Sequence, residues 1–161
     1  ERPGVPRRAV VTLINVSRLR DARRLQSVID SLPEHLAVLD MHGTVRQVNH
    51  AWHMFAARND APGADGHQAG SAVGVGTNYL AVLARATTPD AMDVMRGLQQ
   101  VLSGRIESYR TTYPCHSPTE QRWFVMTATA LHGGEQGAVV SHFDITPWRS
   151  MMEPEGGASD V

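Results

Sequence analysis

The carboxy-terminal half of the chain has the clearest pattern of apolar and polar positions. Residues 121–131 are rich in aromatic, β-branched and methionine side chains over about the length of one strand. Two glycines at 133–134 provide turn chemistry, and the Val-rich residues 138–143 follow them. The pattern predicts a hairpin that ends in an Asp-Ile-Thr tripeptide at 144–146, with a further strand over residues 106–113 before it.

The amino-terminal half predicts a helix, a hairpin and a second helix. In residues 18–32 apolar side chains recur at steps of three and four, which is typical of an amphipathic helix, and a proline ends it. Residues 36–40 and 44–49 flank a glycine turn and predict two paired strands. Asn49 is suited to cap the next helix, predicted over residues 50–58.

Two more helices are predicted between this hairpin and the third strand. The first covers residues 77–86 with Thr77 as its cap, and the second covers residues 88–103, where Pro89 suits the first turn and Gly104 the end. The element order predicts an α/β fold of the α+β type. We expect a five-stranded antiparallel sheet with helices packed on one face, preceded by the amphipathic linker helix.

The composition narrows the class of protein. The chain has 161 residues, of which 42% are hydrophobic and 19% charged, as in soluble globular domains. A net charge of −1 gives no reason to expect nucleic acid or an anionic membrane as a partner. One cysteine excludes an internal disulfide, and no apolar run approaches the length of a membrane span. We therefore expect a cytoplasmic protein.

Three short motifs occur in a fixed order near the end of the chain. They are Tyr-Pro-Cys-His-Ser-Pro at 113–118, Arg-Trp-Phe at 122–124 and Asp-Ile-Thr at 144–146. With the strand, turn and strand that join them, the chain resembles a PAS domain, and one bacterial subgroup of that family in particular. The resemblance covers residues 25–149 and implies the PAS fold and a sensory role.

A short internal repeat indicates how the parent protein is organised. Residues 9–20, AVVTLINVSRLR, match residues 138–149, AVVSHFDITPWR, at an offset of 138 − 9 = 129 residues, about one domain. We expect the first stretch to end a preceding PAS domain of a tandem pair; the alternative is a chance similarity of two Val-rich strands. The predicted layout is a remnant at 1–17, the linker helix at 18–33, the PAS domain at 34–149 and a flexible tail at 150–161.

The resemblance also locates a candidate ligand pocket. In PAS domains the residue two before the Asp of Asp-Ile-Thr usually points into the ligand cavity, and here that residue is His142. Strand alternation and the flanking helices extend the set. The candidates are His142, Val140, Phe124, Met126, Arg122, Tyr79, Met95 and Leu98. A register shift of one residue would exchange the two sheet faces, and the alternative to a pocket is a filled core with His142 as a core histidine.

The linker helix has two interpretations. Tandem sensors often pair such a helix with its copy in a second chain, which implies a dimerising, signal-transmitting element. The candidate residues for this contact are Leu19, Ala22, Leu25, Val28 and Ile29. The alternative is a helix that covers the open face of its own sheet.

Other sites receive less support. His50 and His53 have a spacing that can ligate a metal, but the sequence places no third ligand. Heme-binding PAS sensors usually take their histidine from the long helix, and residues 88–103 contain none, so heme is disfavoured. Flavin photochemistry needs a cysteine before that helix, whereas Cys115 follows it. A small enzyme built on Cys115 and His116 is a further alternative, although neighbours in a strand point to opposite faces.

The resemblance therefore implies a non-catalytic sensory module of a bacterial signal-transduction protein. Family habit suggests a histidine kinase or a cyclic-dinucleotide enzyme as the effector in the same chain. We expect a homodimer and a small organic ligand, with no nucleic acid and no direct membrane contact by this segment. The alternative function is a homodimerisation scaffold without a ligand.

Overall fold

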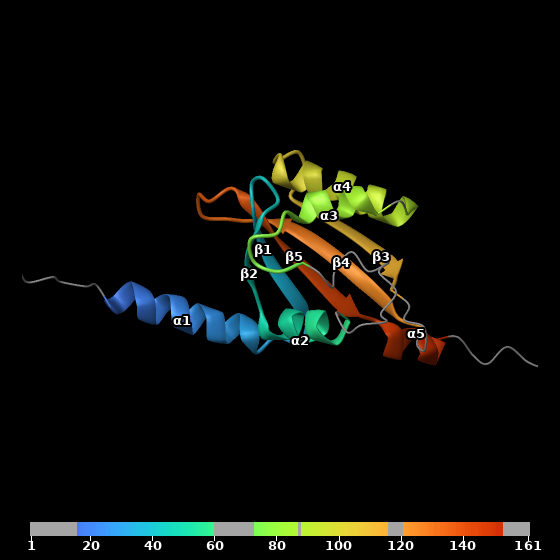
Figure 1. Ribbon diagram of the computed structural model, residues 1–161, viewed down its shortest axis with the longest axis horizontal. Helices are drawn as coiled ribbons and strands as arrows, with labels where there is room; N and C mark the ends of the chain where they lie inside the picture. The colour runs from blue at the N-terminus through green and yellow to red at the C-terminus, as the bar shows by residue number, and fades with distance from the viewer. Residues whose placement is uncertain (1–15, 60–72, 87, 116–120, 153–161) are drawn as a thin grey trace, which may run out of the picture.

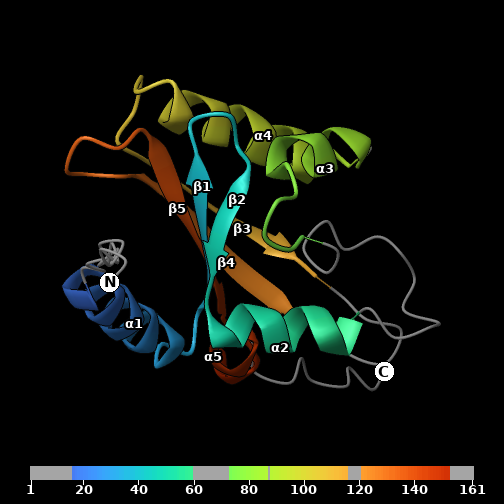
Figure 2. The ribbon, with the colours of Figure 1, turned by 60° about the vertical axis from the view of Figure 1, so that its left-hand side comes forward.

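The computed structural model describes residues 16–59, 73–86, 88–115 and 121–152. Five strands form one antiparallel sheet, as predicted, and their order is β2-β1-β5-β4-β3. The strands are β1 (His35–Asp40), β2 (Val45–Val48), β3 (Ser108–Pro114), β4 (Trp123–Ala130) and β5 (Gly137–Asp144). The helices are α1 (Val16–Asp30), α2 (His50–Asn59), α3 (Tyr79–Arg85), α4 (Pro89–Leu102) and α5 (Thr146–Met152). Helices α2, α3 and α4 lie on one side of the sheet (Figures 1 and 2).

Alternating burial defines the inner face of the sheet. In β4 the buried side chains are Phe124, Met126 and Ala128, and the residues between them are partly exposed. In β5 the inner face carries Val140 and His142. The register places His142 beside Met126 of β4 on one side and beside His35 of β1 on the other. His142 is therefore an imidazole in an otherwise apolar layer.

Helix α4 approaches the sheet closely because it presents a glycine there. A Cβ on Gly97 would lie 2.3 Å from Cδ2 of the Tyr109 ring, so no larger side chain fits without a shift. The Tyr109 hydroxyl donates to Oδ2 of Asp93 in the same helix at 2.6 Å. Leu98 and Val101 fill the core beside this contact. This packing fixes the position of α4 over β3 and β4.

Helix α1 is attached to the domain at its carboxy-terminal end and projects away from the sheet (Figure 1). The side-chain amide of buried Asn49 donates to carbonyl oxygens where α1 ends. These oxygens belong to Ile29 (3.0 Å), Leu32 (3.2 Å) and Glu34 (2.8 Å). Oδ1 of Asn49 accepts from the N–H groups of Leu36 and Trp52, and so caps α2 as predicted. One side chain thus joins α1, β1 and α2.

Two capping predictions have different outcomes. Thr88 caps α4, and its hydroxyl oxygen accepts from the N–H of Ala91 at 3.3 Å, as the sequence pattern indicates. The predicted cap of α3 at Thr77 is wrong, because Asn78 takes this position and accepts from the N–H of Ala81 at 2.9 Å. The Thr77 carbonyl pairs instead with the N–H of Val45, which keeps Thr77 in the extended segment before the helix.

The ends of the predicted layout need correction as well. Val16 and Ser17 belong to α1, so the predicted strand remnant does not reach position 17, and residues 1–15 lie outside the described part. Helix α5 continues to Met152, into the segment predicted to be a flexible tail. Residues 153–161 lie outside the described part. Within the described ranges, no helix is long and apolar enough to span a bilayer.

Candidate functional site

A histidine held between two tyrosines lies at the inner face of the sheet. Nε2 of His142 in β5 is 3.1 Å from the hydroxyl oxygen of Tyr79, the first residue of α3. Nδ1 of His142 is 2.7 Å from the hydroxyl oxygen of Tyr113 in β3. We call these three residues the Tyr-His-Tyr triad. Both ring nitrogens are engaged, although the three residues are far apart in the chain.

The environment of the triad keeps all three side chains uncharged at neutral pH. Burial lowers the pKa of His142 to about 3, and the charge of His35 acts in the same direction. Burial raises the pKa of Tyr79, with a further contribution from the Cys115 thiol. Burial also raises the pKa of Tyr113, and Tyr79 and Cys115 add to it. The triad therefore contains hydrogen-bonding groups but no charge.

Aromatic rings surround the triad. The indole of Trp52 in α2 lies edge-on to the imidazole of His142, with ring centroids 5.5 Å apart. The Trp52 Nε1–H donates to the carbonyl oxygen of Val73 at 2.7 Å, so the indole is held in place. On the other side the ring of Phe124 stacks with that of Tyr113 at 6.0 Å. Flat apolar surfaces thus face the polar groups of the triad, as is typical of small-molecule sites.

A half-buried rim separates this cluster from solvent. The rings of His35 and Phe55 lie 4.4 Å apart, and both approach Phe124. The Arg122 guanidinium carbon lies 5.7 Å from the centre of the Phe55 ring, and Arg122 Nε donates to the carbonyl oxygen of Cys115. Burial lowers the pKa of His35, partly offset by the charge of Asp144. The rim is thus the more polar edge of the site.

The predicted pocket residues do not all lie together. His142 and Tyr79 are joined directly, and Phe124 belongs to the same aromatic cluster. Met126, Val140 and Leu98 are buried in the shared core, and Met95 is only partly buried against it. Arg122 directly precedes β4, is half-buried, and lies at the rim over the Phe55 ring rather than inside.

Three members of the cluster were not among the predicted site residues. Tyr113 lies near the end of β3. Only its pairing with Phe124 of β4 brings it to the inner face. Trp52 has an apolar helical spacing that predicts a core position but not contact with His142. His35 follows the linker helix and reaches the site through its pairing with His142. If an order of strand pairing had been assumed from the sequence, it could have placed Tyr113 and His35 near His142.

The predicted dimer helix presents an apolar stripe to solvent. Exposed fractions are 53% for Leu19, 66% for Leu25 and 57% for Val28. Ala22 is also exposed, whereas Ile29 is partly buried where α1 meets the domain. Figures 1 and 2 show that α1 does not cover the sheet, so the alternative of a helix that covers its own sheet is not supported.

The remaining candidates lack a supporting geometry. His50 and His53 are both exposed, and no group of three or more potential metal ligands occurs among the described residues. Cys115 is buried, and burial raises the pKa of its thiol, which disfavours the thiolate that a nucleophile needs. His116 lies outside the described residues.

Comparison with known proteins identifies the family. A family model described as "PAS fold" matches residues 29–149 of the chain. The chain belongs to the PAS-fold family. The described part of this PAS domain matches that family in its sheet and helices, as the sequence predicts.

Three similar proteins put this PAS domain in context. An uncharacterised 104.1 kDa protein in the hypE 3′ region of Rhodobacter capsulatus is 42% identical over 149 residues. The alignment covers 90% of this chain but only 15% of that protein. A phage VqmA–DPO complex has a TM-score of 0.54 at 18% identity, covering 86% of this chain and 60% of the other. The sensor region of a sensor histidine kinase has a TM-score of 0.50 at 17% identity, covering 71% and 40%.

Proposed function

We propose that this PAS domain is a non-catalytic sensory module that binds a small organic ligand beside the Tyr-His-Tyr triad. The observation that carries the proposal is the placement of His142, a polar side chain bonded at both ring nitrogens inside an apolar core. The imidazole nitrogens and the phenol oxygens add nothing to hydrophobic stability, because each of these polar atoms must be desolvated. Such groups are typical of sites that orient a ligand.

A physical route connects the triad with α1. The imidazole of His142 touches the indole of Trp52, whose backbone N–H is bonded to Oδ1 of Asn49. The amide of Asn49 in turn donates to Ile29 at the end of α1. A ligand that displaces the indole therefore changes the geometry at the α1 attachment. Differential binding to the two arrangements would shift their populations, which is how a ligand can bias a flanking helix.

The comparisons support a sensory role at the level of the family. One structural neighbour is described as a sensor region of a histidine kinase, and another as VqmA in complex with DPO. These likenesses concern the fold, because the identities are only 17% and 18%. For the parent protein we propose a longer signalling chain, with a histidine kinase or cyclic-dinucleotide enzyme as effector. This chain spans 15% of the length of its curated relative.

Native mass spectrometry of the purified chain, compared with its denatured mass, tests the proposal. We expect additional mass that is lost on denaturation, and a ligand so identified should raise the melting temperature by mass action. The matched variant is Trp52→Phe, which keeps an aromatic ring but loses the indole N–H bond to Val73. A protein that carries no extra mass, and that no compound of a broad chemical library stabilises, would contradict the proposal.

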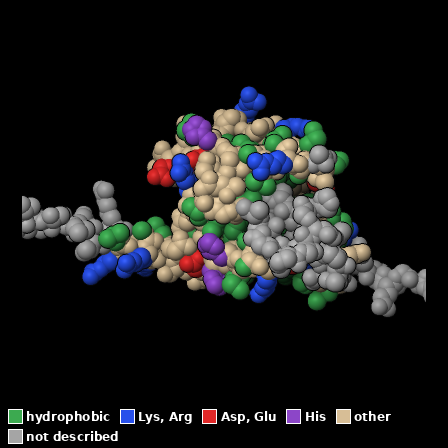
Figure 3. Space-filling view, viewed as in Figure 1, with side chains coloured by type: hydrophobic (Ala, Val, Ile, Leu, Met, Phe, Trp, Pro, Cys, Tyr) green, Lys and Arg blue, Asp and Glu red, His purple; other side chains and the backbone are tan. Residues whose placement is uncertain are grey.

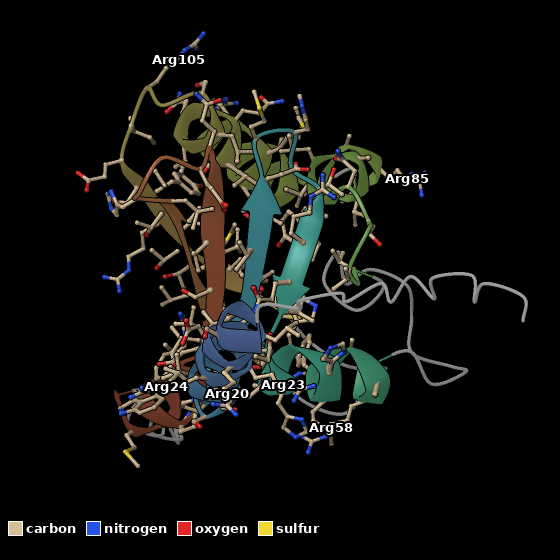
Figure 4. The ribbon with its side chains drawn as sticks, turned by 90° about the vertical axis from the view of Figure 1, so that its left-hand side faces the viewer. Arg20, Arg23, Arg24, Arg58, Arg85 and Arg105 are labelled. Carbon is tan, nitrogen blue, oxygen red and sulfur yellow. The ribbon has the colours of Figure 1, made fainter. Side chains whose placement is uncertain are left out.

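A second function rests on the exposed stripe of α1, namely homodimerisation as a scaffold. The residues that face solvent on this helix include Leu25 and Val28. Arginines flank them: Figure 4 labels Arg20, Arg23 and Arg24, all on α1, in the lower part of the view. Figure 3 shows apolar and basic side chains next to each other on the projecting helix. Two copies pairing along α1 would bury the apolar stripe but bring like charges together.

Sedimentation velocity at several salt concentrations tests the scaffold. Added salt should strengthen self-association, because it screens repulsion between the arginines of the two copies while leaving apolar burial intact. A monomer at every protein and salt concentration would contradict this function. A dimer that forms without any bound ligand, and whose stability depends on protein concentration alone, would favour the scaffold over the sensor.

A further inference from the structure

The hydrogen atoms of the Tyr-His-Tyr triad can be counted. A neutral imidazole carries one N–H donor and one lone-pair acceptor. Tyr79 and Tyr113 contact different ring nitrogens of His142, so one tyrosine donates its O–H to the ring and the other accepts from the ring N–H. The accepting tyrosine keeps a hydroxyl hydrogen that the triad does not use.

The distances indicate which tyrosine keeps this hydrogen. Bonds donated by a hydroxyl are usually shorter than those donated by an N–H group, about 2.7–2.8 Å against about 2.9–3.0 Å. The Tyr113 oxygen lies 2.7 Å from Nδ1 of His142, and the Tyr79 oxygen lies 3.1 Å from Nε2. These distances favour Tyr113 as the donor to Nδ1 and the Nε2–H of His142 as the donor to Tyr79. On this assignment the unused hydrogen belongs to Tyr79.

The Tyr79 hydroxyl has no second partner within the described part of the chain. Only 2% of Tyr79 is exposed, and within the described residues the one hydrogen bond of its hydroxyl is to His142. The buried Cys115 thiol is near enough to raise the pKa of both phenols, but sulfur is a weak acceptor. A buried donor without an acceptor is destabilising, and native proteins keep few of them.

The imidazole bonded to this hydroxyl is not completely enclosed by protein. His142 lies on the inner face of the sheet, yet 7% of its surface is not covered by protein. Trp52 and Tyr79 approach the imidazole from α2 and α3, with ring centroids 5.5 and 6.5 Å from it. A flat molecule entering here meets aromatic faces and the one unused donor of Tyr79.

We propose that the ligand of this PAS domain is an uncharged, flat molecule whose carbonyl oxygen or ring nitrogen accepts a hydrogen bond from the Tyr79 hydroxyl. This inference rests on the proposed sensory function and specifies its ligand class. The ligand is uncharged because the triad provides no opposite charge, and an unpaired charge is costly to bury. The acceptor orients the molecule, and its apolar body packs between Trp52 and the opposite aromatic rings.

The first test is the protonation of His142, measured by long-range proton–nitrogen NMR on the whole chain. We expect a protonated Nε2 and an unprotonated Nδ1 at neutral pH. The opposite tautomer would assign the unused hydrogen to Tyr113 and would overturn the assignment to Tyr79. This measurement requires no ligand, so its result is independent of whether the sensory function is correct.

The second test compares probes of equal shape by NMR titration. Acetophenone and α-methylstyrene differ in a carbonyl oxygen against a CH₂ group, and 2-acetylnaphthalene and 2-isopropenylnaphthalene form the same pair on two rings. We expect each ketone to bind roughly tenfold more tightly than its hydrocarbon, since one such hydrogen bond is worth about 1.4 kcal/mol or one decade. Benzoate, which carries a charged acceptor, should bind more weakly than acetophenone.

Two matched variants locate the effect. Tyr79→Phe should abolish the preference for the ketone, whereas Tyr113→Phe should keep it, because Tyr79 still carries the unused hydrogen. Equal binding of ketone and hydrocarbon to the unmodified protein would refute the hydrogen bond but leave the sensory function standing. Tighter binding of benzoate would refute the uncharged class. Failure of every probe to bind would refute this inference, whereas the proposed sensory function is tested separately by native mass spectrometry and the compound library.

Discussion

The buried imidazole of His142 makes a quantitative prediction about acid stability. Its pKa is lowered by burial from the ordinary value of 6.5 to about 3. The folded state therefore stays neutral over a range in which the unfolded chain binds a proton. This contribution to stability is fully present above pH 6.5 and is lost progressively as the pH falls toward 3.

The magnitude follows from the two pKa values. At pH 5 proton binding stabilises the unfolded state by RT ln(1 + 10^1.5), which is about 2 kcal/mol. This free energy depends little on the pKa of His142 in the folded state, provided that this pKa stays below about 4. A loss of about 2 kcal/mol is a large part of the stability of a typical domain, and it should shift the denaturant midpoint measurably.

Urea unfolding followed by circular dichroism at pH 8 and pH 5 measures this loss. The matched control is His142→Gln, which keeps a donor and an acceptor between the tyrosines but cannot titrate. We expect the unmodified protein to lose about 2 kcal/mol more than the variant between the two pH values. Because the loss of stability between pH 8 and pH 5 is compared for the two proteins, any constant cost of the substitution and the contributions of other titrating groups cancel. The same pH dependence in both proteins would show that His142 titrates normally and that the reasoning is wrong.

Three more predictions concern the frame around the site. Gly97→Ala should lower the free energy of unfolding by about 1–3 kcal/mol, because the new methyl group meets the Tyr109 ring; unchanged urea midpoints would contradict this packing. Asn49→Asp keeps the acceptor that caps α2 but buries a carboxylate oxygen against carbonyl oxygens at the end of α1, so hydrogen exchange should accelerate most there and the whole domain should also lose stability, whereas Asn49→Ala should destabilise both helices. Leu25→Glu should weaken self-association in analytical ultracentrifugation, while Met92→Glu, at a similarly exposed position on α4, should leave it unchanged; equal effects would exclude a specific α1 contact.

Periodicity predicted most of the fold because it reports on local geometry. Strands β4 and β5 bury every second residue, so the alternation around Met126 and Val140 already separates the inner from the outer face. Turns and caps were equally local: Thr88 and Asn49 fill the roles that their residue types favour. The cap of α3 failed because Thr77 is held in a backbone pairing with Val45, a contact distant in the sequence.

The candidate site was only partly predictable for the same reason. The motif resemblance identified His142, and the helical set included its partner Tyr79, but nothing local indicated that the two would bond. Tyr113 and His35 reach His142 through strand pairing across the sheet. Trp52 reaches it only because α2 packs over β1.

The sequence by itself therefore determined the elements, the inner face of the sheet and the family, because each depends on short-range patterns of burial and turn chemistry. Only the tertiary structure decided that two phenols enclose one imidazole, and that Asn49 joins this region to α1. Residues up to 63 positions apart make the first of these contacts. Hydrogen bonds between such distant side chains depend on the order of the strands and the placement of the helices, and no periodicity within a single element records either.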